Sequence, residues 1–227
     1  MTKKELIFRN PFGALGIDCD DMINGGELGA VMARAGLGKT SLVVQMALHA
    51  MACGKKVLHV SLDEPVNKVS VWYNEMFANL ADLNRVEEPQ SAYDEILPNR
   101  MILTMNVDGF SMARLEERIN DLVEQDLFNP DMMIIDGYPF EEKGRADMEE
   151  LKALASRMGY FALFTVKTHR HEEPADNGLP VQLTGVDDIF STLLQIIPEN
   201  NTIFVKSVKG TKADKEAVLD PETMIIR

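Results

Sequence analysis

Short apolar runs alternate along the chain with longer segments in which apolar residues recur every three or four positions. The short runs predict buried strands, because parallel strands that are covered on both faces are apolar throughout. The longer segments predict helices with an apolar stripe. This alternation is typical of an α/β fold with a mostly parallel central sheet flanked by helices. We expect its strands at residues 28–34, 57–62, 100–105, 132–136 and 160–166.

Four helices are expected between these strands, at residues 39–53, 65–83, from 112 onward, and 146–158. Ser111 is a predicted N-cap of the third helix, and Gly159 is predicted to end the fourth. In the first helix the apolar residues are expected to line one face. These residues are Leu42, Val43, Met46, Ala47 and Ala50.

The pattern changes after residue 166. Residues 169–187 are polar and rich in proline and glycine, which predicts a long loop. Two or three closing strands are expected near residues 191–197, 202–208 and 223–226. No internal repeat or linker is evident, so we expect one domain over residues 1–227.

The amino-acid composition indicates where in the cell the protein works and which partners it is expected to bind. The net charge of −13 disfavours nucleic acid as a partner, because a polyanion would need a local basic patch to bind. The two cysteines, Cys19 and Cys53, fit neither a disulfide framework nor a zinc site. Neither a signal peptide nor a membrane-spanning segment is evident. We therefore expect a cytoplasmic protein that does not insert in a membrane.

The segment between the first predicted strand and the first predicted helix is rich in glycine and ends in Lys39 and Thr40. Glycines let successive backbone N–H groups surround phosphate oxygens, and the start of a helix adds a positive dipole. Lys39 is expected to reach the β- and γ-phosphates of ATP, and Thr40 to ligate Mg²⁺. The predicted nucleotide-binding residues here are Ala35, Gly36, Leu37, Gly38, Lys39, Thr40 and Ser41.

One position departs from the full phosphate-loop pattern GxxxxGK[ST]. Ala33 stands where that pattern has glycine, and alanine would be strained there if the backbone required a positive φ. The alternative interpretation of this segment is an ordinary glycine turn with an exposed lysine.

Carboxylates follow two of the other predicted strands. Asp136 ends the run at 132–136 and is predicted to hold Mg²⁺ together with Thr40, on a strand neighbouring the strand at 28–34. Asp63 and Glu64 follow the strand at 57–62, at the edge where open α/β sheets bind ligands. Glu64, ahead of Asp63, is the candidate base that polarises the attacking water. Alternatively, both only cap the next helix.

These motifs resemble the RecA-like ATPases grouped around KaiC, RadA and DnaB. The resemblance covers the lead-in with Gly16-Ile17-Asp18 and residues 25–29, the phosphate loop, residues 61–65 and residues 133–136. DnaB-like members also have alanine at the first loop position. The resemblance implies a single bare RecA-like domain that binds ATP and Mg²⁺ and forms a homo-oligomer such as a hexamer.

The C-terminal part of the resemblance lies at Asp187-Asp188 and at residues 206–211. In relatives the second segment reaches the nucleotide of the neighbouring subunit, which implies that role for Lys209, or for Lys206. The alternative is an exposed basic strand end.

Two further loops carry candidate chemistry. Lys167 or His169 is a candidate sensor of the γ-phosphate, while the cluster at 169–173 is incomplete as a metal site. Tyr138 and Phe140 are expected to be exposed and to stack on bases or on a partner protein, and neighbouring Glu141 and Glu142 favour the protein.

Three functions are compatible with this sequence. The first is a KaiC-like ATPase whose nucleotide state controls a protein partner or its own assembly. The second is a nucleic-acid-dependent ATPase, such as a recombination accessory or helicase-like protein. The third is a nucleotide-binding module with little turnover.

Overall fold

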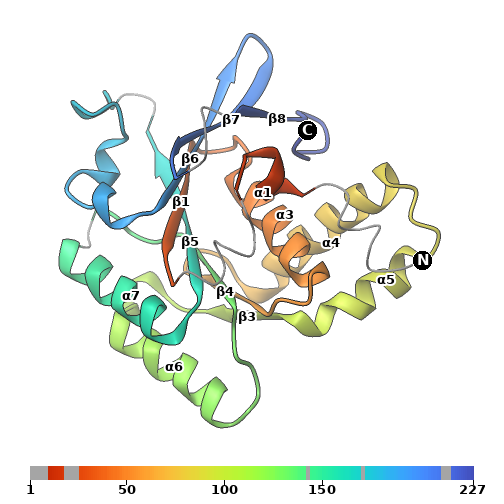
Figure 1. Ribbon diagram of the computed structural model, residues 1–227, viewed down its shortest axis with the longest axis horizontal. Helices are drawn as coiled ribbons and strands as arrows, with labels where there is room; N and C mark the ends of the chain where they lie inside the picture. Colours follow the sequence, from red (N-terminus) through yellow and green to blue (C-terminus); the bar gives the residue numbers. More distant parts are fainter. Residues whose placement is uncertain (1–9, 18–25, 142–143, 170–171, 211–215) are drawn as a thin grey trace.

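The computed structural model describes residues 10–17, 26–141, 144–169, 172–210 and 216–227 (Figure 1). Within these residues the centre of the fold is a sheet of eight strands in the order β3-β2-β4-β5-β1-β6-β7-β8. The pairs from β3 to β6 are parallel, and β7 and β8 are antiparallel. The strands are β1 (Leu28–Arg34), β2 (Val57–Ser61), β3 (Arg100–Thr104), β4 (Met132–Asp136), β5 (Phe161–Thr168), β6 (Thr192–Glu199), β7 (Thr202–Lys209) and β8 (Glu216–Leu219).

Helices cover both faces of the sheet (Figure 1). One face packs against α1 (Pro11–Ala14), α3 (Lys39–Ala52), α4 (Val66–Leu83) and α5 (Pro89–Ile96), and the other against α6 (Met112–Glu124) and α7 (Arg145–Met158). In β4 the side chains alternate between the two cores. Met132 and Ile134 pack toward α3, whereas Met133 and Ile135 pack toward α6 and α7. The predicted fold class, a RecA-like P-loop α/β fold, is confirmed.

Helix α3 is more deeply buried than predicted. The five apolar residues predicted to share one face are buried, and so is every other residue from Leu42 to Ala52, including Gln45 and His49. The reason is that other segments cover its second side. The ring of Phe12 in α1 lies 5.8 Å from that of His49, and the backbone N–H of Ile226 donates to the Gln45 carboxamide oxygen at 3.1 Å.

Strand and helix boundaries follow the local signals closely. Ser111 caps α6 by accepting from the Arg114 N–H at 3.3 Å, and α7 ends at Gly159 with φ of 75°. Short elements were missed: α1, α5 and β8 were not predicted. The strand expected at 223–226 is wrong, because only Ile226 makes a bridge there, to Leu219.

The long segment after β5 contains, in its described part, only the short 3-10 turns η4 (Val181–Leu183) and η5 (Asp187–Ile189) before β6. Of the lead-in, Asp18 and Gly25 lie outside the described residues. No helix in the described ranges is both long and apolar enough to cross a membrane. A single domain over the whole chain stays a prediction.

Candidate functional site

The glycine-rich segment forms the turn between β1 and α3. Gly36 and Gly38 have φ of 78° and 92°, a left-handed conformation that glycine adopts without the steric cost of a Cβ. Ala33 belongs to β1, is buried, and has no positive φ, so the strain considered for it is absent. The reason is that the turn begins after β1 ends at Arg34.

Lys39 folds back over the end of β1. Its ammonium donates to the carbonyl oxygens of Ala33 at 3.0 Å and Arg34 at 3.1 Å. Burial lowers the pKa of Lys39, Asp136 opposes that shift, and neighbouring Lys167 adds to it. An anionic ligand beside Lys39 would therefore stabilise its charged form. Of the other predicted loop residues, Ala35, Gly36, Leu37 and Gly38 precede Lys39 in the chain, and Thr40 and Ser41 follow it in the first turn of α3.

Two hydroxyl groups hold the Asp136 carboxylate. Thr165 in β5 donates to one carboxylate oxygen at 2.5 Å, and Thr40 donates to the other at 3.3 Å. Burial raises the pKa of Asp136, the two hydroxyl groups and Lys39 lower it, and Asp63 raises it further. The sequence analysis did not single out Thr165. Its only local signal is a hydroxyl within a buried apolar strand.

The expectation that the strand of Asp136 neighbours the phosphate-loop strand is wrong. Strand β5 lies between β4 and β1, pairing in parallel with both. The physical consequence is that Thr165 stands between the loop and Asp136. Its hydroxyl also accepts from the Gly137 N–H at 3.3 Å, which anchors the chain where β4 ends.

Asp63 and Glu64 lie at the same edge of the sheet. A Cβ on Gly137, whose φ is 85°, would lie 2.6 Å from a carboxylate oxygen of Asp63, so only glycine lets Asp63 approach Asp136. The Ser61 hydroxyl accepts from the Glu64 N–H at 3.1 Å and donates to the Glu64 carbonyl at 2.9 Å. The Glu64 carboxylate pairs with Lys68 at 2.5 Å. The alternative that these acids cap α4 is wrong, because Pro65 is the N-cap and no side chain caps the helix.

These groups converge on one cleft of about 500 Å³. It is lined by the predicted residues Ala35, Lys39, Thr40, Asp63, Glu64 and Asp136. Lys167 and His169, the candidate phosphate sensors, also line it. So does Trp72, the one tryptophan of the chain, which sequence reasoning missed because helical spacing does not reveal a cleft.

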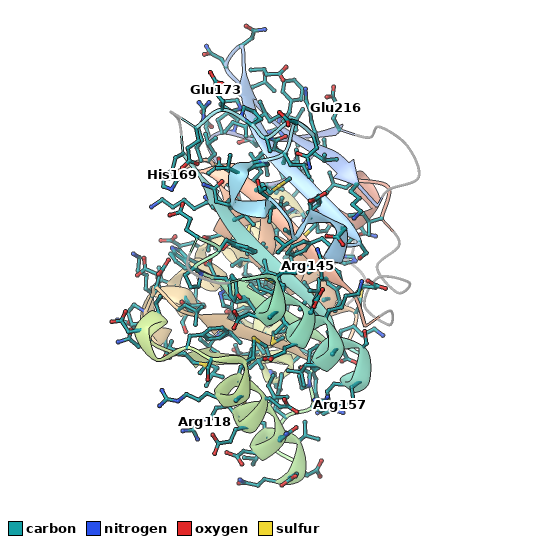
Figure 2. All side chains as sticks on the ribbon, turned by 90° about the vertical axis from the view of Figure 1, so that its left-hand side faces the viewer. Arg118, Arg145, Arg157, His169, Glu173 and Glu216 are labelled. Atoms are coloured by element: carbon teal, nitrogen blue, oxygen red, sulfur yellow. The ribbon has the colours of Figure 1, made fainter. Side chains whose placement is uncertain are left out.

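Lys209 lies outside this cleft. Its ammonium donates to the backbone carbonyl oxygens of Asp187 at 2.9 Å and Asp188 at 3.4 Å. The Asp188 carboxylate in turn pairs with Arg145 at 2.7 Å, and Arg145 is labelled on α7 in Figure 2. Lys206 pairs with Glu199 at 2.8 Å. Action of Lys209 on a neighbouring subunit stays a prediction.

The aromatic residues after β4 are not exposed. Tyr138 is 6% exposed, and its ring lies 4.8 Å from that of Phe140 and 5.4 Å from that of Phe164. Phe140 is half-buried in the same cluster. The expectation that both are exposed is therefore wrong, because the loop folds back on the core, and stacking of Phe140 on a partner stays a prediction. Glu142, cited for the same loop, lies outside the described residues.

Thr40 and Asp136, which form the floor of the cleft together with Lys39, offer oxygen atoms of the kind that Mg²⁺ binds. That ion prefers oxygen ligands and is held in phosphate-binding sites by few protein groups. The Thr40 hydroxyl and the Asp136 carboxylate are 3.3 Å apart and face the end of the phosphate loop. Thr40 and Asp136 are therefore the groups that would hold it.

Comparison with known proteins agrees with this geometry. A family model described as AAA domain matches residues 18–150, more than half of the chain, and its range contains β1, the phosphate loop, β2 and β4. A search of curated proteins finds no match. By this match the chain belongs to the AAA domain family of P-loop ATPases.

Proposed function

We propose that this protein is a KaiC-like, Mg²⁺-dependent ATPase whose nucleotide state controls its own assembly or a protein partner. The observation that carries the proposal is the convergence of Lys39, Thr40 and Asp136 with Asp63 and Glu64 on one cleft. At these strand ends, the Lys39 ammonium can bind phosphate, and the Thr40 hydroxyl and Asp136 carboxylate can bind the metal ion. The Asp63 and Glu64 carboxylates can orient and deprotonate a water molecule.

In this proposal the glycine-rich loop and Lys39 bind the phosphates. The left-handed glycines Gly36 and Gly38 turn backbone N–H groups toward the start of α3, where the helix dipole favours an anion. Lys39 now donates to two backbone carbonyl groups, and a phosphate oxygen would replace them as its acceptor. The nucleotide thereby gains a charge-assisted hydrogen bond from a partly desolvated ammonium.

Thr40 and Asp136 would hold Mg²⁺, which neutralises charge on the phosphate oxygens. Thr165 orients the Asp136 carboxylate through its hydroxyl, as outer partners of metal ligands commonly do. Burial raises the pKa of Asp136 because it disfavours the charged carboxylate. A bound cation would stabilise that charged form.

Glu64 is the proposed general base. Its backbone is held at both N–H and carbonyl by the Ser61 hydroxyl, so only the side chain is free to turn. The ion pair of Glu64 with Lys68 is exposed, and pairs of this kind contribute about 1 kcal/mol or less. Turning the carboxylate away from Lys68 toward a water is therefore inexpensive. Asp63, beside Gly137, is the alternative base or orients Glu64.

A nucleic-acid-dependent ATPase is the competing proposal. It loses support here because Tyr138 is buried and the net charge is −13. Salt-dependent binding of single-stranded DNA would restore it. A module without turnover would bind ATP and release no phosphate.

The proposal is tested by phosphate release from the full chain across a range of protein concentrations, with Mg²⁺ and with EDTA. We expect turnover that needs Mg²⁺ and rises more than linearly with protein concentration, since a trans contribution requires assembly. Light scattering of the same samples with ATP and with ADP reports the oligomer. Absence of Mg²⁺-dependent turnover at every concentration would overturn the enzyme assignment. Linear turnover by a monomer would overturn the assembly.

A further inference from the structure

Two segments that are far apart in the chain bring metal-binding side chains together beside the proposed nucleotide cleft. Glu141 follows β4, His169 follows β5, and Glu172 lies on the segment beyond it. One ligand atom from each residue lies within 4.8 Å of the others, and His169 Nε2 is 3.2 Å from a Glu141 carboxylate oxygen. Figure 2 labels His169 at the end of β5 and Glu173 on the segment that follows.

A buried amide is aimed at the same point. Gln182 is 8% exposed, and its Nε2 donates to Glu172 at 2.5 Å and to Glu141 at 3.4 Å. Its carboxamide oxygen is buried and has no hydrogen-bond partner among the described residues. Its Nε2 group faces the two carboxylates in this structure. A cation bound between them would instead favour the carboxamide oxygen at that place.

The charges of this cluster are compatible with a cation. The Glu141 and Glu172 carboxylates are exposed, so solvent screens their repulsion, but both accept from one neutral amide. A divalent cation would convert that repulsion into attraction. The buried Gln182 then acts as a ligand or as an outer partner that orients both carboxylates.

We propose that Glu141, His169 and Glu172, with Gln182, form a binding site for a first-row transition-metal ion of the Zn²⁺ type. One imidazole nitrogen with carboxylate oxygens suits Zn²⁺, whereas Mg²⁺ and Ca²⁺ prefer oxygen ligands alone. Ligand bonds of about 2.0–2.2 Å place neighbouring ligands roughly 3–3.5 Å apart, so small side-chain rotations close the present spacing.

This ion would lie at a different place in the cleft from Mg²⁺. Glu141, His169 and Gln182 also line the nucleotide cleft, so the ion would link the end of β4, the end of β5 and η4 around its rim. Glu141 is 28 residues from His169 in the chain. A chelate made only from the sequence neighbours His169, His171 and Glu172 would not need Glu141. That difference makes the site testable.

The test is isothermal titration of the metal-stripped full chain with ZnCl₂, without nucleotide and with excess Mg²⁺. We expect one Zn²⁺ per chain, and at least ~10-fold weaker binding for Glu141→Gln, His169→Gln and Glu172→Gln. Glu173→Gln, which removes the adjacent acid outside the cluster, and Asp136→Asn, at the Mg²⁺ site, should bind Zn²⁺ as the parent does. Circular dichroism establishes that each variant is folded.

Two results would overturn the proposal: no Zn²⁺ binding by the parent, or parental affinity in Glu141→Gln. Loss of binding in His171→Gln with parental binding in His169→Gln would likewise assign the metal elsewhere. Since no nucleotide is present, these outcomes do not depend on ATP turnover. Failure of the ATPase proposal would leave Zn²⁺ binding intact.

Discussion

The floor and the rim of the proposed nucleotide cleft are built differently. At the floor, Lys39, Thr40 and Asp136 come from the ends of regular elements and are joined by hydrogen bonds to backbone carbonyl groups and hydroxyl groups. At the rim, Glu64 pairs with Lys68 and His169 pairs with Glu141, and both of these pairs are solvent-exposed.

We infer from this difference that the floor binds the ligand and that the rim changes once the ligand is bound. Strand ends and partly buried hydrogen bonds hold the floor in one geometry before any ligand arrives, which suits recognition of phosphate and metal. The exposed ion pair of Glu64 with Lys68 and the exposed hydrogen bond between His169 and Glu141 contribute little stability, so a ligand can rearrange them at small cost. The floor should therefore determine whether nucleotide binds, and the rim what happens afterwards.

The largest expected effect is at the floor. Lys39→Ala should abolish tight Mg-ATP binding, because it removes the cation that faces the phosphates. The fold should persist, since the Lys39 ammonium contacts only two backbone carbonyl groups. Trp72 lines the cleft, so its fluorescence can report the titration. Lys56→Ala, an exposed lysine beyond the other end of α3, is the matched control. Equal ATP affinity in Lys39→Ala and parent would falsify the phosphate-loop assignment.

The next effect is at the rim. Glu64→Gln should bind ATP normally but hydrolyse it at least ~10²-fold more slowly, as expected when a positioned base is lost. Single-turnover hydrolysis is measured beside Asp63→Asn, with affinity determined separately. If Asp63→Asn is inactive and Glu64→Gln nearly normal, the two acids exchange roles. If both hydrolyse ATP normally, the base lies elsewhere.

Asp136→Asn should reduce Mg²⁺-dependent turnover at least ~10-fold while changing nucleotide affinity less, because the carboxylate acts through the metal. Turnover and Trp72 fluorescence are followed as Mg²⁺ is varied. Survival of parental turnover would move the metal role to another acid.

Thr165→Val tests the support behind the floor. Losing the hydroxyl that holds Asp136 should raise the Mg²⁺ concentration needed for half-maximal turnover, by about 10-fold. Thr168→Val changes the last residue of the same strand and serves as control. A similar shift in both variants would indicate a general effect on β5.

The smallest effect concerns stability without ligand. Burial raises the pKa of Asp136 above its unfolded value, so its ionised form destabilises the fold above the folded-state pKa. That penalty disappears as pH falls below the unfolded value of about 3.9. Asp136→Asn should therefore unfold at higher temperature than the parent near neutral pH, each kcal/mol adding roughly 2–4 °C. The gap should shrink in acid. A lower melting temperature at neutral pH would show that the lost hydrogen bonds outweigh burial.

Local patterns determined the elements that build the floor. The apolar run of β1, the glycines after it and the helical spacing from Lys39 are contiguous, so periodicity and backbone preference specify them without distant contacts. The same holds for β4, whose end at Asp136 was predicted correctly. The fold class followed from their alternation.

Long-range packing decided the rest. Strand order places Thr165 between the loop and Asp136, and no local pattern encodes which strands become neighbours. The burial of Tyr138 and the meeting of Glu141 with His169 depend on where a loop folds after the sheet has formed. Sequence periodicity specifies which face of an element is apolar, but not what covers that face. Glu64 was placed at this edge from the sequence, whereas only the tertiary structure decided that Glu141 and His169 meet at the rim of this cleft.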